Sequence, residues 1–422
     1  MKAIVSAKKI NGSIKAISSK SFVHRALISA ALSKEKTEIF CNTVSDDIAA
    51  TATCLNQFAA NVSQKDDRFI VMPYSKNQKN GNIVLNCGES GSTYRFLLPV
   101  AAAHGEDAVF LLDGRLKDRP MDPFFNALES HGIKISGKNE SKVSVIGKLT
   151  SGTFALPGDI SSQYITGLLF ALPSLSGDSK IKLTSPLQSK GYVDITLSTL
   201  KSFGITADVS ESVIKIKGNQ RFVSPKTIVS EGDWSNSAFW LCAAAVSGEI
   251  MVTGLSTSSV QGDRAVCDIL KRFGANVIES KNSVTVKKGK LCGIKIDVSE
   301  IPDLVPALAV AAAGANGKTV FYNADRLRHK ESDRLYSISH TLSLLGADTA
   351  ITADKLIVSG NGHLSGGTVH SFFDHRIVMM ASLAALISKD NVIIENAESV
   401  SKSYPLFFKD FRKLGANISE VL

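Results

Sequence analysis

The stretch Ala265-Val-Cys-Asp-Ile-Leu-Lys-Arg-Phe-Gly-Ala-Asn-Val277 determines the fold, because related segments return along the whole chain. Apolar side chains stand at helical spacing before its glycine, which is itself typical of a left-handed helix end. A strand-like alternation begins after the glycine. Such segments recur at a spacing of roughly 70 residues. They are FAANV from Phe58, HGIKI from His131, FGITA from Phe203, FGANV from Phe273, LGADT from Leu345 and LGANI from Leu414. Ala59 replaces the glycine in the first copy, which predicts a different helix end there.

A second series of segments keeps the same period. Ala-rich stretches such as Ile377-Val-Met-Met-Ala-Ser-Leu-Ala-Ala-Leu386 have no wide polar face, and a helix that is apolar all round is buried on all sides. These helices are predicted to open near Ser21, Ser92, Ser162, Ser235, Asp303 and His375. Each repeat therefore combines a buried helix, an amphipathic helix and short strands in a βαβαββ order.

Six repeats in a chain of 422 residues favour an α/β protein of two domains with three repeats each. One crossing between the domains is expected in Val229–Trp234, and a second near Asn11–Ser18 if the N-terminal strand joins the second half. The predicted domains are residues 1–15 plus 230–422, and residues 16–229. An open solenoid is the alternative, but solenoid repeats usually have about 20–45 residues.

The overall composition points to a cytoplasmic protein that binds small anions. Lysine and arginine exceed the acidic residues by nine, yet the basic residues form no single block and aromatic residues make up only 7%. This distribution favours phosphate or carboxylate ligands over a nucleic-acid surface. The six cysteines form no CxxC pair and no metal-ligand spacing, so they are expected to be buried thiols in a reducing compartment. We also expect no signal peptide and no membrane span.

Polar residues gather at the predicted helix starts. Helix N-termini present unpaired N–H groups and the positive end of the helix dipole. If both domains direct these helix starts toward a shared cleft, that cleft attracts anions. Simple helix capping explains any single Ser, Thr or Asp equally well, but not their recurrence at corresponding points of six repeats. The cationic side chains expected to act there are Lys20, Arg25, Arg95, Arg119, Lys330, Arg334, Arg376 and Lys402.

Several of these motifs resemble those of one enzyme family. Ser19-Lys-Ser-Phe-Val-His-Arg-Ala-Leu27, Gly88-Glu-Ser-Gly-Ser-Thr-Tyr-Arg95 and Leu327-Arg-His-Lys-Glu-Ser-Asp-Arg334 are similar, in order and spacing, to the 3-phosphoshikimate 1-carboxyvinyltransferases (EPSP synthases). Asp118-Arg-Pro120, Ser161-Ser-Gln163, Ile301-Pro-Asp303 and Asp374-His-Arg376 extend the resemblance over essentially the whole chain. It implies a two-domain inside-out α/β barrel, an active site in the interdomain cleft, and neither metal nor organic cofactor. Glyphosate binds at the phosphoenolpyruvate site of sensitive members.

The resemblance also implies a role for each matching residue. Catalysis would use Lys20, Asp303 and Glu331. Shikimate 3-phosphate would be bound by Lys20, Ser21, Arg25, Ser161, Ser162, Gln163, Ser189, Tyr192, Asp303 and Lys330. Phosphoenolpyruvate would be bound by Lys20, Gly91, Arg119, Gln163, Arg334, His375, Arg376 and Lys402. We expect a monomer without nucleic-acid or membrane partners.

Three other functions remain as alternatives. A related enzyme that transfers enolpyruvyl to UDP-N-acetylglucosamine typically has Lys-Asn where this chain has Lys20-Ser21, and it carries a cysteine where Gly114 stands. An RNA-binding protein would suit the basic charge, but no aromatic stacking surface is evident. A catalytically inactive scaffold would not need the acidic and basic residues that are intact here.

Overall fold

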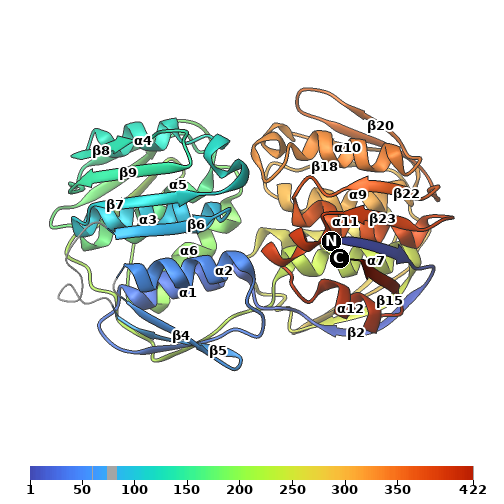
Figure 1. The fold of residues 1–422 in the computed structure, drawn as a ribbon, viewed down its shortest axis with the longest axis horizontal. Coiled ribbons are helices and arrows are strands. Elements are labelled where there is room, and N and C mark those ends of the chain that lie inside the picture. The colour runs from blue at the N-terminus through green and yellow to red at the C-terminus, as the bar shows by residue number, and fades with distance from the viewer. Residues whose placement is uncertain (59, 74–82, 422) are drawn as a thin grey trace. The chain divides into compact units, whose positions relative to one another are not determined.

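The computed structural model describes residues 1–58, 60–73 and 83–421 (Figure 1). The chain forms two compact units. Unit 1 comprises Met1–Ile17 and Glu231–Leu422, and unit 2 comprises Ser18–Ser230. The boundaries predicted from the sequence fall after residues 15 and 229. Each unit is a mixture of helices and short strands, as the fold class predicted.

The helices expected to be apolar all round form the interior of each unit. Every residue of α7, α9 and α11 is buried, and these three helices contact one another within unit 1. In unit 2, α3 packs against α5. The helices begin close to the predicted positions, which confirms this part of the prediction. Their bounds are α1 Lys20–Ala31, α3 Gly91–His104, α5 Ser162–Ala171, α7 Trp234–Ser247, α9 Val305–Ala313 and α11 His375–Ala384.

The amphipathic helices end as the repeated segments predict. The glycines after the last five of them all have positive φ: Gly132, Gly204, Gly274, Gly346 and Gly415. A side chain is strained in that conformation, so glycine is favoured there. The helices are α2 Asp46–Gln57, α4 Asp122–Glu129, α6 Lys190–Ser202, α8 Val266–Phe273, α10 Arg334–Leu344 and α12 Phe407–Lys413. The expectation for Ala59 lies outside the described residues.

The described strands form four-stranded sheets with one repeated order. In the sheet β6-β7-β9-β8, β6 pairs in parallel with β7, β7 pairs antiparallel with β9, and β8 is an antiparallel edge. With α3 and α4 between its strands, this repeat has the predicted βαβαββ order. Its strands are β6 Ile83–Gly88, β7 Ala108–Leu112, β8 Ile133–Ser136 and β9 Lys142–Gly147.

Two further sheets contain only strands that follow one another along the chain. In unit 2 they are β10 Thr153–Leu156, β11 Ser179–Leu183, β12 Asp208–Val209 and β13 Val213–Ile216. In unit 1 they are β18 Lys295–Asp297, β19 Asn316–Tyr322, β20 Asp348–Ile351 and β21 Leu356–Asn361.

Each of the other three sheets contains a strand from a distant part of the sequence. In unit 2, β14 Thr227–Val229 completes the sheet of β3 Thr37–Phe40, β4 Asn61–Lys65 and β5 Arg68–Met72. In unit 1, β2 Ile10–Lys15 joins β15 Gly248–Thr253, β16 Asn276–Ser280 and β17 Ser283–Lys287. Strand β1 Lys2–Ser6 lies between β23 Val392–Glu395 and β24 Asn417–Val421, with β22 Gly367–His370 at the edge. The N-terminal strand therefore belongs with the second half of the chain.

One expectation about the cysteines is wrong. Five of the six thiols are buried, but Cys292 is exposed. Its neighbour Leu291 takes the inward position at that turn, so the next side chain faces outward. Among the helices of the described residues, none is long and apolar enough to cross a bilayer.

Candidate active site

The start of α1 in unit 2 places a lysine beside a carboxylate. Ser19 caps the helix, because its hydroxyl accepts a hydrogen bond from the backbone N–H of Phe22. The ammonium of Lys20, the first residue of α1, donates to Asp47 in the first turn of α2 at 2.6 Å. Both side chains are largely covered, at 17% and 15% exposed. The ammonium is thus held in one place at the helix start.

The guanidinium of Arg25, one turn further along α1, is held by several oxygens. It donates to the carbonyls of Ser21 and Tyr192 at 2.6 and 3.0 Å, and to the hydroxyl of Thr196 at 2.8 Å. Burial lowers the pKa of Arg25 to about 9, and the nearby Tyr192 opposes that shift. A buried cation held by neutral carbonyl and hydroxyl oxygens is suited to a phosphate or carboxylate ligand.

The N-terminus of α3 meets two further arginines. Ser90 caps this helix and Gly91 is its first residue. A Cβ added to Gly91 would lie 2.9 Å from a terminal nitrogen of Arg119 and 3.2 Å from one of Arg95. Glycine at this position therefore lets the two guanidinium groups approach the helix start closely.

The side chain of Gln163 connects α5 to this same region. Its amide oxygen accepts from Arg95 at 2.7 Å, and its amide nitrogen donates to the hydroxyl of Ser92 at 3.0 Å. Ser161 caps α5, because its hydroxyl accepts from the N–H of Gln163. Ser162 is buried in the first turn. Ser161 is therefore a helix cap, and the same hydroxyl can also contact a ligand at the start of α5.

Ser189 and Tyr192 stand at the start of α6. Ser189 precedes the helix with a left-handed backbone, φ 55°, which is uncommon for a residue other than glycine. Tyr192 reaches the cluster through its carbonyl, which accepts from Arg25. Hydrogen bonds around Arg25, Arg95 and Gln163 therefore link predicted residues from α1, α3, α5 and α6 within unit 2.

Unit 1 carries a second charged cluster, centred on Arg334 at the start of α10. Its guanidinium donates to Asp374 at 2.8 Å, to Asp303 at 2.8 Å and to Glu331 at 2.7 Å, although the side chain is only 1% exposed. Burial alone would lower the pKa of Arg334, but the three carboxylates raise it above its usual value. Two of these carboxylates are the predicted catalytic residues Asp303 and Glu331.

Asp303 lies in the 3₁₀ turn η5 (Pro302–Leu304) and has two more cationic neighbours. The ammonium of Lys330 lies 3.3 Å from its carboxylate, and the guanidinium of Arg376 lies 3.6 Å from it. Arg376 also donates to the Asp303 carbonyl at 3.0 Å. Burial lowers the pKa of Lys330, and the charge of Asp303 opposes this shift only in part.

The remaining predicted residues of unit 1 lie around the loop before α11. Asp374 caps that helix through the N–H of Arg376, and His375 follows it as a buried residue. Lys402, at the end of η8 (Ala397–Lys402), donates to the carbonyl of Phe373 at 2.7 Å. The structure thus brings the residues predicted in unit 1 to the region of α10, α11 and η5.

Sequence reasoning gave no role to several residues that hold these clusters together. Asp47 pairs with Lys20, Thr196 holds Arg25, and Asp374 holds Arg334. Asp47 lies at the start of an amphipathic helix, and the other charged motifs also lie at helix starts. Its position in the repeat was therefore a signal for a role in the site. Asp374 belongs to the motif Asp374-His-Arg376, but nothing in the sequence indicates that it pairs with Arg334.

A buried carboxyl, Asp263, is a further group without a predicted role. It lies at the start of η4 (Gly262–Ala265) and accepts a hydrogen bond from Ser235. Burial and the nearby charge of Asp303 raise its pKa to about 7, while Arg376 opposes the shift. This carboxyl therefore belongs to the electrostatic surroundings of Asp303.

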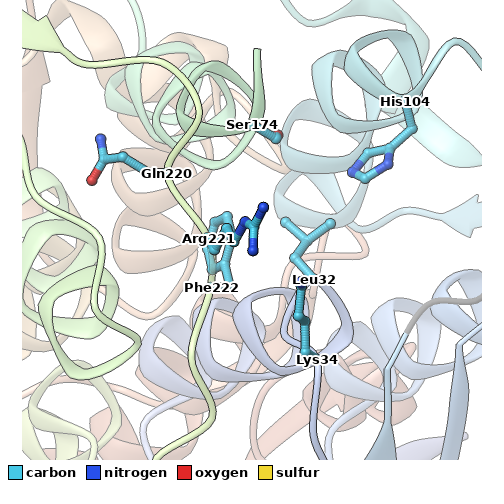
Figure 2. A pocket seen from close by; sticks show the side chains of 7 residues that line it. All are labelled: Leu32, Lys34, His104, Ser174, Gln220, Arg221 and Phe222. Carbon is cyan, nitrogen blue, oxygen red and sulfur yellow. The ribbon is translucent and has the colours of Figure 1, made fainter. Parts of the chain in front are cut away.

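A small cavity in unit 2 lies at the opposite ends of the buried helices. Figure 2 shows that its lining includes the last residue of α3, the residue after α1 and the extended segment 220–222. Its volume is about 120 Å³, which is below the usual range for small-molecule sites. The lining residues are Leu32, Lys34, His104, Ser174, Gln220, Arg221 and Phe222. None of the predicted site residues lines it.

Comparison of the sequence with known proteins gives a consistent result. Residues 4–411 match the family described as EPSP synthase (3-phosphoshikimate 1-carboxyvinyltransferase). A 3-phosphoshikimate 1-carboxyvinyltransferase of Clostridium kluyveri is 43% identical over 422 residues, covering 99% of this chain and 98% of the relative. One of Clostridioides difficile is 42% identical over 426 residues, covering 98% and 97%.

Solved structures are similar over the same length. An EPSP synthase from Acinetobacter baumannii matches with a TM-score of 0.82 and 25% identity, covering 99% of this chain and 100% of that one. The enolpyruvyl transferase NikO from Streptomyces tendae matches with a TM-score of 0.81 and 18% identity, covering 99% and 98%. The second likeness concerns the fold alone.

Proposed function

This chain belongs to the EPSP synthase family and transfers the enolpyruvyl group of phosphoenolpyruvate to shikimate 3-phosphate, and we propose that the two charged clusters supply its substrate contacts. The reaction serves the synthesis of aromatic amino acids. We propose that the reaction takes place in the cytoplasm. The enzyme would act as a monomer, without nucleic-acid or membrane partners and without a metal or organic cofactor.

The acceptor, shikimate 3-phosphate, is assigned mainly to the helix starts of unit 2. Its phosphate needs hydroxyl, N–H and guanidinium donors, which Arg25 and the first turns of α1, α5 and α6 provide. Asp303 and Lys330 of unit 1 would contact its hydroxyl groups. The assigned residues are Lys20, Ser21, Arg25, Ser161, Ser162, Gln163, Ser189, Tyr192, Asp303 and Lys330.

Phosphoenolpyruvate is assigned to the residues around Gly91 and Arg334. It carries a carboxylate and a phosphate on a small frame, and both groups bind well to paired guanidinium donors. The close approach of Arg119 to the start of α3 supports this assignment. The assigned residues are Lys20, Gly91, Arg119, Gln163, Arg334, His375, Arg376 and Lys402.

The chemistry requires proton transfers at two atoms. The 5-hydroxyl oxygen of the acceptor bonds to C2 of phosphoenolpyruvate while C3 takes up a proton, which gives a tetrahedral adduct. The C–O bond to phosphate then breaks, C3 returns a proton, and phosphate leaves. We assign the hydroxyl proton to Asp303, the C3 proton to Glu331 and the bridging oxygen to Lys20.

The observation that carries this assignment is the buried guanidinium of Arg334, which holds Asp303 and Glu331 at once. It fixes two carboxylates that must act on two atoms bonded to the same carbon, C2 of phosphoenolpyruvate. Side chains fixed in advance in this way lower the reorganisation that the reaction requires.

A rapid-quench measurement tests the role of Glu331. Glu331→Gln removes the acid and base at C3, so the tetrahedral adduct should form about 100-fold to 10,000-fold more slowly from phosphoenolpyruvate and shikimate 3-phosphate. Glu129→Gln is the matched control, because Glu129 pairs with Lys138 at 2.7 Å outside both clusters. Adduct formation at the wild-type rate in Glu331→Gln would exclude the assigned role. Phosphate release should also be measured with UDP-N-acetylglucosamine in place of shikimate 3-phosphate, and none is expected.

A further inference from the structure

A chain of buried side-chain hydrogen bonds runs through the interior of unit 2. It begins at His24 on α1, whose Nδ1 lies 2.6 Å from Oγ1 of Thr51 on α2. Oγ1 of Thr51 lies 2.6 Å from Oγ1 of Thr93 on α3, and Thr93 donates to the Ser90 hydroxyl at 2.7 Å. All four side chains are at most 1% exposed. The chain therefore connects three helices without contact with solvent.

The direction of these hydrogen bonds follows from counting protons. A hydroxyl group carries a single proton, and that of Thr93 is used toward Ser90. The bond between the two threonines must then use the proton of Thr51. With its own proton used, Thr51 can only accept from His24, so the proton of that bond belongs to Nδ1.

The surroundings of the ring are consistent with a neutral imidazole. Burial and the neighbouring charges of Lys20 and Arg25 lower the pKa of His24 well below its ordinary value. Nε2 is buried and makes no hydrogen bond to any described residue, while the ring edge faces Phe96 with centroids 6.5 Å apart. A charged ring would place a second N–H in this position without an acceptor, which is costly.

We propose that His24 is a positioning residue for the reaction: as the neutral Nδ1–H tautomer it fixes, through Thr51 and Thr93, the first turn of α3. The proposal rests on the assignment of phosphoenolpyruvate to Gly91. Ser90 is the cap of α3 and Gly91 is the next residue, so a shift of Ser90 moves the glycine relative to Arg119 and Arg95. Displacements well below 1 Å matter at such a site.

His24 lies between two residues assigned to the acceptor, Lys20 and Arg25, on the same helix. The hydrogen-bond chain thus joins the helix assigned to shikimate 3-phosphate to the helix start assigned to phosphoenolpyruvate. A general contribution to core stability is the alternative, and it would affect both substrates equally. The proposal instead requires a specific loss of affinity for phosphoenolpyruvate.

The first test measures the tautomer in the unmodified full chain. Histidine labelled with ¹⁵N in the imidazole ring gives long-range proton–nitrogen NMR correlations that distinguish the two neutral tautomers and the cation. The His24 signals are identified by their disappearance in His24→Asn. Signals of a neutral ring protonated at Nδ1, at pH 7.5, support the proposal. The Nε2–H tautomer or an imidazolium overturns it, and neither result depends on which substrate binds where.

The second test compares two amides at the same position. The amide nitrogen of asparagine can occupy the place of Nδ1, whereas that of glutamine extends toward the place of Nε2. His24→Asn should therefore keep the wild-type KM for phosphoenolpyruvate. His24→Gln and the isosteric Thr51→Val should raise it roughly threefold to thirtyfold, with KM for shikimate 3-phosphate within about twofold of wild type.

The outcomes separate the two proposals. Equal changes in both KM values, or identical behaviour of His24→Asn and His24→Gln, would overturn the positioning role. Gly91→Ala tests the underlying assignment by itself, because its added methyl group would meet the two guanidinium groups. A wild-type KM for phosphoenolpyruvate in Gly91→Ala would reject the binding assignment, whatever the NMR tautomer is.

Discussion

At the scale of single residues, the cationic side chains assigned to the substrates already have partners within the protein. Lys20 pairs with Asp47, Arg334 with three carboxylates, and Lys402 with the carbonyl of Phe373. An incoming anion must share or replace these oxygens. Substrate binding is therefore an exchange of partners, in which protein carboxylates keep the charges in place beforehand.

The burial of His24 predicts how stability depends on pH. The unfolded chain binds a proton at His24 below a pKa near 6.5, whereas the folded chain does not, because burial lowers the pKa. The stability from the neutral ring is present above pH 6.5 and is lost as the pH falls, by at most about 1.4 kcal/mol per pH unit. The thermal midpoint should therefore fall more steeply between pH 7.5 and 5.5 in the wild type than in His24→Asn.

His363→Asn, which removes an exposed histidine, is the control for that comparison. Parallel curves for the wild type and His24→Asn would mean that His24 takes up its proton in the folded protein.

The sequence predicted the charged residues of the candidate site better than the contacts between them. Lys20, Asp303 and Arg334 stand in recognisable motifs at helix starts. Their partners could not be found, because Arg334 and Asp374 are 40 positions apart and Arg25 and Thr196 are 171 apart. Only the packing of repeats against one another brings such pairs together.

At the scale of secondary-structure elements, the helices were predictable and the strand partners were not. Helical periodicity and capping residues are local signals, and Ser45, Ser90 and Asp333 all cap helices as their types suggest. Short strands such as β14, with three residues, carry little periodicity. Strand β14 pairs in parallel with β3, although nearly the whole of unit 2 lies between them in the sequence. No local sequence pattern indicates such a distant partner.

A pair of glycines tests how the amphipathic helices end. Gly274 has φ +104°, and a Cβ there would lie 2.5 Å from the backbone oxygen of Lys290. Gly317 has φ +94°, but a Cβ there would meet nothing within 4 Å. Gly274→Ala should lower the free energy of unfolding by more than about 1 kcal/mol, and by more than Gly317→Ala, which adds only the backbone strain. Equal losses in urea denaturation would show that the contact with Lys290 is relieved without cost.

At the scale of the whole molecule, the repeats close on themselves through the chain ends. Strand β1 lies between β23 and β24 in its sheet, and β9 lies in the same way between β7 and β8. The pairing is antiparallel, with Lys2 opposite Val421, and Figure 1 shows the two ends of the chain close together within unit 1. The sixth repeat is therefore complete only when both ends of the sequence contribute to it.

A circular permutation tests this description. A short Gly/Ser linker joining Leu422 to Met1 should be tolerated when new ends are opened between Asn139 and Glu140, which are both exposed in a turn. The variant should unfold cooperatively within a few degrees of the wild type and retain transferase activity. New ends opened inside the buried helix α9 serve as the comparison and should prevent folding. Loss of cooperative unfolding in the first variant would contradict the closed repeat.

The position of β1 has a consequence for synthesis on the ribosome. Unit 2 is one continuous segment, so its strands and helices are all available once Ser230 has emerged. Strand β1 ends at Ser6, but its partners β23 and β24 begin only at Val392 and Asn417, so they are synthesised much later. At about 5–20 residues per second, it waits roughly 20–80 s for them. During that time its edge is open to other nascent chains, and chaperones that cover short apolar strands would protect it.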